Sequence, residues 1–431
     1  MPHSLTELKV DIVSKPPGAP AHEITSDVCI VGAGIAGMSA AIESAQLGRD
    51  VLIVDGLPVL GGQMVTSLIG LFCGVYGNAP EHEQLTHGVF DDIFRDLDAS
   101  GDLHFQRGHT TTVYYDEVAL GRWLETRIRD LGVRVVTGAV LRSVDVFEGR
   151  VASVGLATRY GDVTVSALGF VDATGDASLT WEAGLPCHVP EKPIYGSQQV
   201  IAEHVDLDHE PSRDEVTERL AAKAGEYGLI RTDGLAFFFP GRGTAVLNMT
   251  HVEAPLDPVR ASEAQLDGKA QADRVLEFLK AEFPKAFGTA RVRAYGFPGR
   301  RQTRWIKGLH QLTVDEVRAG TRFEDAVART AWPIELHDTP EGYVWEPFDA
   351  DHVHYVPLAS MIPVGVQNLV AAGRCIDADA AALSSVRVMG PCAAMGAGAA
   401  HALHLAGKES VREVDLGALA DQLRANLGRV G

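Results

Sequence analysis

Three glycines stand at positions 32, 34 and 37, in the spacing Gly-x-Gly-x-x-Gly, within the stretch CIVGAGIAGM. Glycine has no side chain, so a loop of this kind can turn tightly and bring its backbone N–H groups close to a phosphate group. The chemistry that this spacing serves is the binding of a dinucleotide such as NAD, NADP or FAD. The spacing alone does not distinguish among these cofactors.

The segments around the glycines match the rest of a nucleotide-binding unit. Residues 28–31 form an apolar run typical of a buried strand, and residues 38–47 have the small side chains of a closely packed helix. A second apolar run at 51–54 ends at Asp55, 23 positions after the first glycine. An acidic side chain at that place binds a ribose hydroxyl. We therefore predict a strand–helix–strand unit in which Gly37 lets the helix pack against the strand.

A second group of residues is suited to proton transfer. His352, His354 and Tyr355 lie together in the stretch DHVHYVP. The pKa of histidine lies near neutrality, so one of these three residues could be the base of an oxidation. The alternative is a histidine with a purely structural role at the end of a strand.

Two arginines are suited to binding an anion. Arg301 and Arg304 lie in the stretch RQTRWIKG. A guanidinium group can hold a carboxylate through two parallel hydrogen bonds, which predicts a clamp for an anionic substrate. The alternative is an ion pair between domains.

The composition indicates a globular protein of more than one domain. The chain has 431 residues, of which 46% are hydrophobic and 22% charged. A net charge of −19 without a basic stripe argues against nucleic acid as a partner. The cysteines at 29, 73, 187, 375 and 392 form no CxxC pair, so we expect neither a metal site nor a redox-active disulfide.

Two features concern membranes and targeting. The N-terminal stretch MPHSLTELKV lacks the basic and then apolar pattern of a signal peptide. The longest weakly polar stretch, at 388–400, is too short to span a bilayer and is typical of a buried helix. We therefore expect a cytoplasmic protein without a membrane span.

The order of segments predicts an α/β fold with an inserted domain. After residue 190 the sequence becomes richer in charge and proline, with helical patterns at 213–227 and 259–283, and strand-like sequence returns at 368–374. The predicted division is an N-terminal arm (1–25), the first part of a nucleotide-binding domain (26–189), a substrate or cap domain (190–350), the return of the nucleotide-binding domain (351–410), and a C-terminal helix or tail (411–431).

Further motifs bear on which cofactor is bound. They are GGQ (61–63), VDATGD (171–176), NLVAAGR (368–374), SSVRVMG (384–390) with the glycine-rich stretch after it, RQTRWIKG (301–308) and IELHD (334–338). Together they resemble flavoproteins of the glutathione-reductase-like fold. Over most of residues 25–407 the chain is similar to the FAD-dependent oxidoreductase family, relatives of the fumarate reductase and tricarballylate dehydrogenase flavoproteins. The resemblance implies a Rossmann-like FAD-binding domain with an inserted α+β substrate domain.

The resemblance also implies an FAD site, position by position. The glycine loop would hold the pyrophosphate, Asp55 the adenosine ribose, and the backbone near Val140 the adenine. The helix that begins at Val388 and Met389 would direct its positive end at the flavin, where reduced flavin carries negative charge. The implied FAD-binding residues are Gly32, Gly34, Ile35, Ala36, Gly37, Asp55, Gly61, Gly62, Gln63, Val140, Thr174, Gly175, Asp176, Gly373, Arg374, Arg387, Val388 and Met389.

Several side chains leave alternatives open. Asp377 stands where relatives often have serine; near the flavin its charge would lower the reduction potential, and toward solvent it would have no effect. Cys73 is either a site of covalent flavin attachment or a small core residue. His337 and Cys375 match family positions, and we interpret both as structural.

The predicted activity is the oxidation of a small organic substrate at a CH–OH, CH–NH or CH–CH bond, with hydride transfer to flavin N5. No second nucleotide-binding pattern is present, so we expect no separate NAD(P)H domain. One alternative is an NAD(P)H-dependent flavin monooxygenase, and another is a flavin-bearing electron-relay subunit of a complex. The electron acceptor, whether oxygen, quinone or another protein, and the formation of a homo-oligomer stay open.

Overall fold

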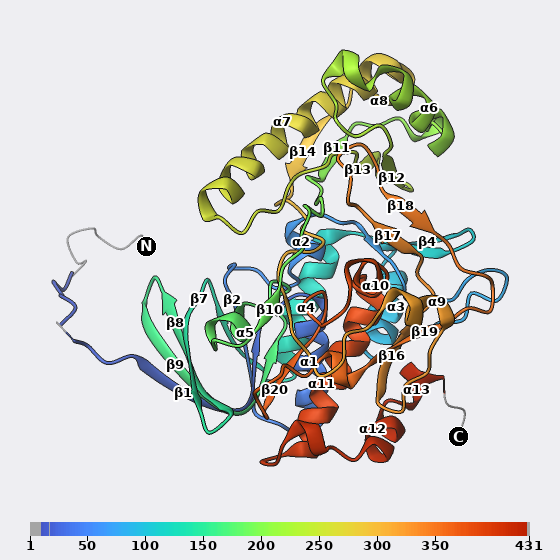
Figure 1. The fold of residues 1–431 in the computed structure, drawn as a ribbon. Coiled ribbons are helices and arrows are strands. Elements are labelled where there is room, and N and C mark those ends of the chain that lie inside the picture. The colour runs from blue at the N-terminus through green and yellow to red at the C-terminus, as the bar shows by residue number, and fades with distance from the viewer. Residues whose placement is uncertain (1–9, 17, 429–431) are drawn as a thin grey trace.

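A mixed sheet of seven strands is the base of the fold in residues 10–16 and 18–428, which this computed structural model describes (Figure 1). Neighbouring strands follow the order β6-β2-β1-β9-β8-β7, and β20 also pairs with β9. The pairs β6–β2, β2–β1, β1–β9 and β9–β20 are parallel, and β7, β8 and β9 form an antiparallel meander. The strands are β1 (His22–Val31), β2 (Val51–Asp55), β6 (Arg134–Thr137), β7 (Val140–Phe147), β8 (Arg150–Thr158), β9 (Gly161–Asp172) and β20 (Leu369–Ala371).

The register of the parallel strands brings their carboxyl ends to one edge of the sheet. Val31 lies opposite both Val54 and Asp172, and Asp172 lies opposite Ala371. The loops that follow these strands therefore meet at the same place, which is where nucleotides bind in sheets of this kind. The predicted α/β fold class is confirmed.

Two helices with small side chains pack together beside the sheet. They are α1 (Ile35–Gln46) and α11 (Met389–Ala406), coloured blue and red in Figure 1. Their backbones approach so closely that a Cβ atom on Gly396 would lie 2.1 Å from the carbonyl oxygen of Ala36. The helix predicted at 38–47 thus begins three residues earlier, and the one predicted at 388–400 extends to Ala406. Among the described residues, no helix combines the length and the apolar character needed to cross a membrane.

A smaller unit, here called the cap (residues 200–295), lies above this body at the top of Figure 1. Its antiparallel sheet has the order β12-β13-β11-β14. Buried apolar side chains of this sheet and its helices form a core separate from the main one. Its elements are β11 (Val200–Glu203), η2 (Leu207–His209), α6 (Arg213–Lys223), η3 (Ala224–Tyr227), β12 (Leu235–Phe239), β13 (Thr244–Asn248), α7 (Pro258–Glu282), α8 (Pro284–Phe287) and β14 (Arg291–Tyr295).

The helices predicted in this unit are confirmed within a few residues. Asp257 and Ser212 cap α7 and α6 with side-chain hydrogen bonds to backbone N–H groups, and Pro258 begins α7. The predicted cap domain extends to residue 350, but Trp305 and Val327 are already buried in the core of the main body. The domain boundaries themselves stay predictions.

The remaining elements surround the sheet and carry the loops of the site. Residues 1–9 and 17 of the predicted arm and 429–431 of the predicted tail lie outside the described residues. The strands are β3 (Leu71–Phe72), β4 (Leu103–Arg107), β5 (Thr111–Tyr115), β10 (Cys187–His188), β15 (Trp305–Ile306), β16 (Ala326–Thr330), β17 (Ile334–Leu336), β18 (Val344–Glu346) and β19 (His354–Pro357). The helices are α2 (Gln63–Thr66), α3 (Val89–Ala99), α4 (Glu117–Asp130), α5 (Ser178–Glu182), α9 (Val314–Ala319), η4 (Leu358–Ser360), α10 (Ala380–Val386), η5 (Val411–Glu413), α12 (Leu416–Gln422) and α13 (Arg424–Leu427).

The contact between α1 and α11 predicts the effect of one added methyl group. Gly396→Ala should lower the free energy of unfolding by about 1–3 kcal/mol, because the new Cβ must displace the backbone of Ala36. Gly225→Ala, in the cap, is the matched control, since a Cβ there would meet no atom within 4 Å. Chemical denaturation measures both; equal midpoints for the two variants would contradict this account of the packing.

Candidate functional site

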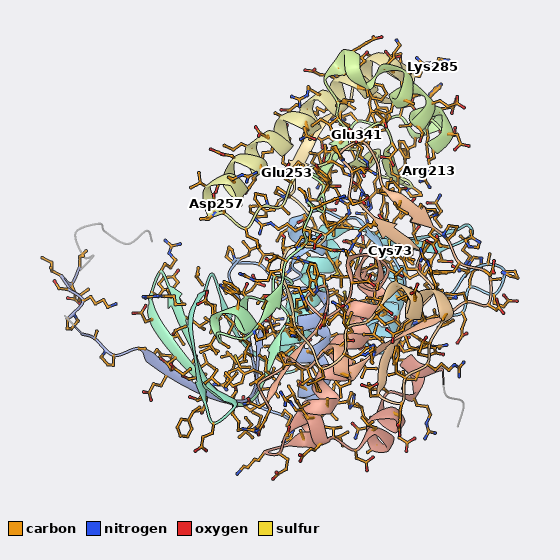
Figure 2. The ribbon with its side chains drawn as sticks, viewed as in Figure 1. Cys73, Arg213, Glu253, Asp257, Lys285 and Glu341 are labelled. Carbon is orange, nitrogen blue, oxygen red and sulfur yellow. The ribbon has the colours of Figure 1, made fainter. Side chains whose placement is uncertain are left out.

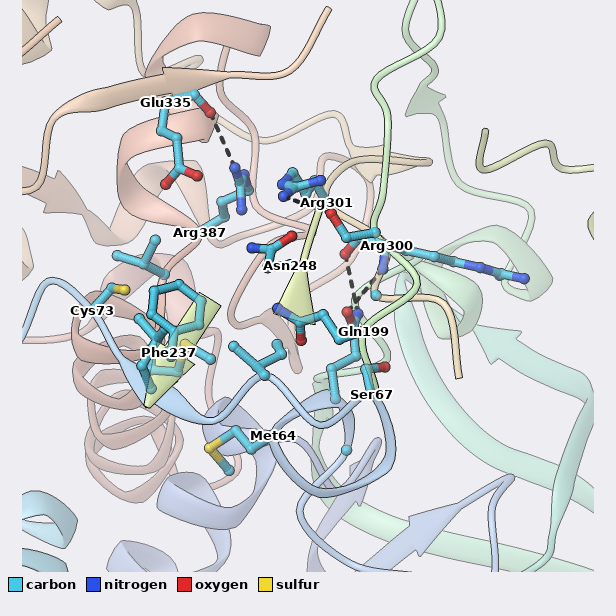
Figure 3. Close-up of a pocket in the computed structure, with 18 of the residues that line it drawn as sticks. Met64, Ser67, Cys73, Gln199, Phe237, Asn248, Arg300, Arg301, Glu335 and Arg387 are labelled. Atoms are coloured by element: carbon cyan, nitrogen blue, oxygen red, sulfur yellow. Dashed lines mark hydrogen bonds between the residues drawn. The ribbon is translucent and has the colours of Figure 1, made fainter. Parts of the chain in front are cut away.

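A cavity of about 1340 Å³ opens between the carboxyl edge of the large sheet and the cap (Figure 3). Its floor includes Gly32, Asp55 and Ala372, and its roof includes Phe237 and Asn248 of the cap. This volume exceeds the roughly 300–1,000 Å³ of ordinary small-molecule sites, so it can hold a dinucleotide together with a substrate. Figure 2 shows Cys73 beneath the cap.

The glycine loop forms the floor because backbone replaces side chains there. Gly32 has φ +105°, and a Cβ on it would lie 2.3 Å from the carbonyl oxygen of Ala173. A Cβ on Gly62 would lie 2.7 Å from the Cα of Gly34, so these two loops also touch through backbone. Gly34 precedes α1 and has no neighbour within 4 Å at its Cβ position. The N-terminus of α1 is thus open toward the cavity and suited to an anion.

Asp55 holds this loop in place from the end of β2. Its two carboxylate oxygens each accept a hydrogen bond of 2.7 Å, one from the N–H of Ala33 and one from the N–H of Leu57. Burial raises the pKa of Asp55, and the two backbone hydrogen bonds oppose this shift. The carboxylate lines the cavity and retains further acceptor capacity, as contact with ribose hydroxyls requires.

Asp176 anchors a second wall. Arg374 donates a hydrogen bond of 2.8 Å to its carboxylate, Thr303 donates another, and Arg300 lies 3.9 Å away. Burial raises the pKa of Asp176, but these cationic and hydroxyl neighbours outweigh burial and bring its pKa below the usual value. Asp172 supports the same turn, because it accepts a hydrogen bond of 2.7 Å from the hydroxyl of Thr174.

The N-terminus of α11 also opens into the cavity. Its N-cap residue, Val388, makes no side-chain cap, and Val388, Met389 and Cys392 line the cavity. A Cβ on Gly390 would lie 2.2 Å from the carbonyl oxygen of Gly74, so this end of the helix packs directly on the loop that follows β3. Uncapped N–H groups at the start of a buried helix favour negative charge nearby.

Most residues predicted to bind the cofactor come together at the cavity. All of the implied FAD-binding residues line it except Gly37 and Val140. Gly37 lies beneath the loop, where a Cβ would fall 1.8 Å from the carbonyl oxygen of Gly32, so it serves the predicted close packing. Val140 begins β7 with 59% of its surface exposed, away from the cavity.

The four predicted catalytic residues separate into two groups. Arg301 lines the cavity, whereas Arg304, His354 and Tyr355 do not. Arg304 turns away to stack on Trp181 at 4.5 Å and donates to the carbonyl oxygen of Asp176. The histidine and tyrosine are buried in β19, which pairs with β16.

The environment of His354 is that of a structural residue. Its ring contacts the hydroxyl of Ser385 at 2.9 Å and the ring of His352 at 3.1 Å. Burial lowers the pKa of His354 to about 3, with a smaller contribution from His352. This histidine therefore stays neutral within the core, as the structural alternative requires.

Of Asp377, Cys73 and Cys375, only Cys73 lines the cavity. Asp377 is buried, accepts hydrogen bonds from the N–H of Gly308 and from Gln311, and points neither into the cavity nor to solvent. Burial raises the pKa of the Cys73 thiol, which lines the cavity; because the thiolate is the nucleophile, this favours the core alternative over covalent attachment. Cys375 is buried against the carbonyl oxygen of Asp172, outside the cavity.

Glu335 is a cavity residue that the sequence analysis did not single out. It lies in β17, and its backbone carbonyl accepts a hydrogen bond of 3.1 Å from Arg387, as Figure 3 shows. Its carboxylate accepts hydrogen bonds from Trp332 and meets the ring of His337 at 2.9 Å. The signal in the sequence was the block IELHD, which was assigned to the family without a role for its acid.

The features of this cavity fit a bound FAD. Two open helix N-termini and a glycine loop in which Gly32 leaves no room for a Cβ suit a pyrophosphate, and the Asp55 carboxylate suits a ribose. Apolar side chains such as Met64 and Phe237 line the part of the cavity beyond the loop, where a planar ring system can pack.

Comparisons with known proteins point to one family. A family model described as FAD dependent oxidoreductase matches residues 27–427. Solved structures found as similar include a geranylgeranyl bacteriochlorophyll reductase-like protein from Thermoplasma acidophilum (15% identity, 94% of this chain and 83% of that chain, TM-score 0.49). They also include a flavin-dependent brominase (14%, 93% and 83%, 0.47) and an L-amino acid deaminase from Proteus vulgaris (17%, 70% and 84%, 0.40). A search of curated proteins found no match.

The open position beside Gly34 allows a variant that separates folding from cofactor binding. Gly34→Ala should leave the unfolding temperature of the cofactor-free protein unchanged, because the new methyl group meets no protein atom. It should weaken FAD binding at least tenfold, about 1.4 kcal/mol, because the methyl group occupies the approach of the pyrophosphate to the loop. Titration of the cofactor-free protein with FAD measures this. An unchanged dissociation constant would show that the pyrophosphate does not lie on this loop.

Proposed function

The chain belongs to the FAD-dependent oxidoreductase family, and we propose that it oxidises a small anionic organic substrate by hydride transfer to the flavin. FAD is the cofactor of this family, and the chain is an enzyme of the oxidoreductase class. To this family membership the proposal adds two points: the substrate is oxidised rather than reduced, and it carries a negative charge. The bond oxidised would be of the CH–OH, CH–NH or CH–CH type.

The observation that carries the proposal is a pair of arginines without anionic partners. Arg301 and Arg387 line the same cavity, and within the described residues neither has a carboxylate within ion-pair distance. Arg301 donates to the carbonyl oxygen of Tyr195 at 2.7 Å and to the hydroxyl of Ser197 at 3.0 Å. Both of these acceptors are neutral. The charge of Glu335 raises the pKa of both arginines, but it acts on them from beyond ion-pair distance.

Burial makes these charges costly in the absence of an anion. Burial, together with the charge of Arg387, lowers the pKa of Arg301 to about 9. The Nε of Arg387 is buried without a hydrogen-bond partner. A substrate carboxylate between Arg301 and Arg387 would form an ion pair with both side chains and would accept the hydrogen bond that Nε of Arg387 lacks. This supports an anionic substrate over a neutral one.

The other residues of the cavity would bind and enclose the reactants. The glycine loop and the N-terminus of α1 would hold the pyrophosphate, and Asp55 the ribose. Apolar side chains of the cap, Phe237 among them, would exclude water from the reacting carbon. Bound FAD supplies the hydride acceptor, and the chain supplies position and charge.

A test of the proposed direction uses NADPH as the reductant. Under anaerobic conditions NADPH should leave the visible flavin band of the purified protein unchanged, because substrate rather than NADPH reduces the flavin. Carboxylates, hydroxy acids and amino acids are then screened for bleaching of the band. Rapid bleaching by NADPH would overturn the proposal in favour of a monooxygenase or reductase.

The substrate charge is tested by comparing two arginines of one loop. Arg301→Met should weaken binding of simple carboxylates about 10- to 100-fold, since a charged hydrogen bond contributes roughly 1.5–3 kcal/mol. The change in the flavin spectrum on addition of carboxylate measures binding. Arg304→Met is the matched control and should bind as the unchanged protein does, because this side chain stacks on Trp181 outside the cavity. Equal loss in both variants would refute a specific clamp at Arg301.

A further inference from the structure

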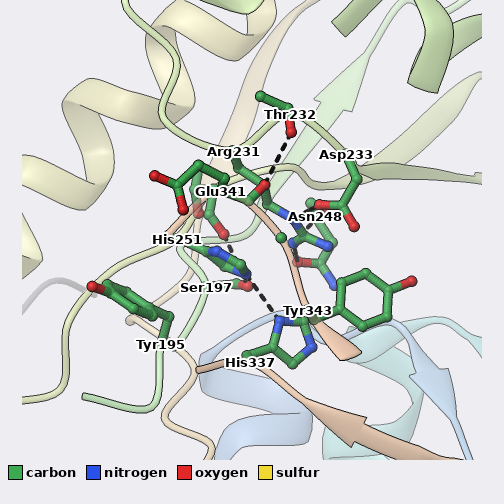
Figure 4. Close-up of polar contacts among 12 residues, drawn as sticks. Tyr195, Ser197, Arg231, Thr232, Asp233, Asn248, His251, His337, Glu341 and Tyr343 are labelled. Atoms are coloured by element: carbon green, nitrogen blue, oxygen red, sulfur yellow. Dashed lines mark hydrogen bonds and ion pairs between the residues drawn. The ribbon is translucent and has the colours of Figure 1, made fainter. Parts of the chain in front are cut away.

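Three side chains form a hydrogen-bonded line that starts at the cavity. The carboxylate of Glu335 meets Nε2 of His337 at 2.9 Å, and Nδ1 of His337 meets Nε2 of His251 at 2.9 Å. Nδ1 of His251 then meets the carbonyl oxygen of Pro340 at 2.9 Å. Figure 4 shows His251 directed at His337, with the ring of Tyr343 beside the latter.

The number of protons on this line follows from its ends. A carbonyl oxygen only accepts, so Nδ1 of His251 must carry a hydrogen, and in a neutral ring Nε2 then accepts from Nδ1–H of His337. A neutral His337 leaves its Nε2 without hydrogen, facing the carboxylate of Glu335. Two neutral rings and a carboxylate thus supply two hydrogens for three contacts. The position between His337 and Glu335 accommodates one more proton.

That position is connected to the cavity. The side chain of Glu335 is 20% exposed and lines the cavity, whereas His337 and His251 are 1% and 2% exposed. The far end of the line stops at a backbone carbonyl, which cannot pass on a proton. A proton can therefore enter and leave this line only at the carboxylate of Glu335.

Charged and titratable groups surround this line on every side. Burial and the charge of Arg301 lower the pKa of His337, whereas Glu335 opposes this shift. Burial lowers the pKa of His251 to about 3, with contributions from Arg231 and Arg301. In a cavity without an anion, these positive charges disfavour a proton at the extra position. The groups that contact the line or act on it through their charge are Arg231, Arg301, Arg387, Tyr343, Tyr195 and Cys73.

We propose that Glu335, His337 and His251 are the proton acceptor of the oxidation, with the proton entering between Glu335 and His337. This rests on the proposed function. The substrate loses a hydride, with two electrons, to oxidised FAD, and its O–H or N–H proton moves to the Glu335–His337 contact. A C–OH group becomes C=O, or a C–NH group becomes C=N. The negative charge of a bound carboxylate offsets Arg301 and Arg387, which favours proton uptake at this moment.

The same chain contains a second pair of neighbouring histidines, one buried and one half-buried, which serves as a control. His352 and His354 contact each other at 3.1 Å, but neither lines the cavity and no carboxylate completes their line to it. Both pairs have rings in contact and at least one ring that is fully buried. They differ in the connection to the cavity through Glu335.

The first experiment counts protons without using a substrate. The FAD-loaded protein is labelled with ¹⁵N-histidine, its ring signals are assigned with His251 and His337 variants, and the pH is lowered across the range in which the protein stays folded. We expect Nε2 of His337 to take up a proton before His251 and His354 do, at a pH below the usual range of histidine.

Glu335→Gln provides the decisive comparison. A glutamine amide can donate to Nε2 of His337 and still accept from Trp332, so all three contacts are satisfied and the fold is kept. The negative charge is gone, however, and uptake at His337 should move to lower pH by at least one unit or vanish. Identical titrations of the two proteins, uptake first at His251, or no uptake at His337 before unfolding would each overturn the proposal.

The second experiment follows the rate of flavin reduction with any substrate found by the bleaching screen. Glu335→Gln should lower this rate about 100-fold or more and remove its dependence on pH at the acid side. His352→Gln should change neither. Failure of every anion to bind or bleach would refute the proposed function while leaving the proton count decisive on its own.

Discussion

The cavity depends on places where backbone touches backbone with no side chain between. Gly32 meets the strand end at Ala173, Gly62 meets Gly34, and Gly396 lets α11 lie against α1. These contacts hold together the loops that follow several parallel strands at one sheet edge. Because interiors are close-packed, the loops cannot shift independently, and the two helix N-termini stay directed at the same space.

Charge is distributed unevenly along this cavity. On the nucleotide side, Asp176 is compensated by Arg374 and nearby donors. On the cap side, Arg301 and Arg387 bond only to neutral acceptors. A buried charge that the protein leaves unpaired costs stability in the free enzyme, and an anionic ligand repays this cost on binding. A protein of net charge −19 thus has, among its described residues, two arginines without an ion pair in this cavity.

The sequence predicted those parts of the site that are set by neighbours in the chain. Spacing and apolar runs predicted the glycine loop and Asp55, because strand, turn and helix follow one another locally, whereas the resemblance to the family predicted that the last helix points at the site. Val140 and Arg304 do not line the cavity, since the place of a strand end and the direction of a side chain depend on strand register and tertiary packing. The line from Glu335 to His251 was not predicted, since it joins residues more than eighty positions apart.

The hydrogen bond from Arg387 to the carbonyl oxygen of Glu335 ties two properties of the enzyme together. One partner supplies charge to the cavity, and the other presents the carboxylate at its wall. The acceptor belongs to the main chain, so a change of the Glu335 side chain leaves it in place, whereas a change at Arg387 removes a donor that holds this part of β17. The two residues are therefore coupled in one direction only: replacement of Arg387 would reach the wall that presents the carboxylate, and replacement of Glu335 would leave Arg387 held as before.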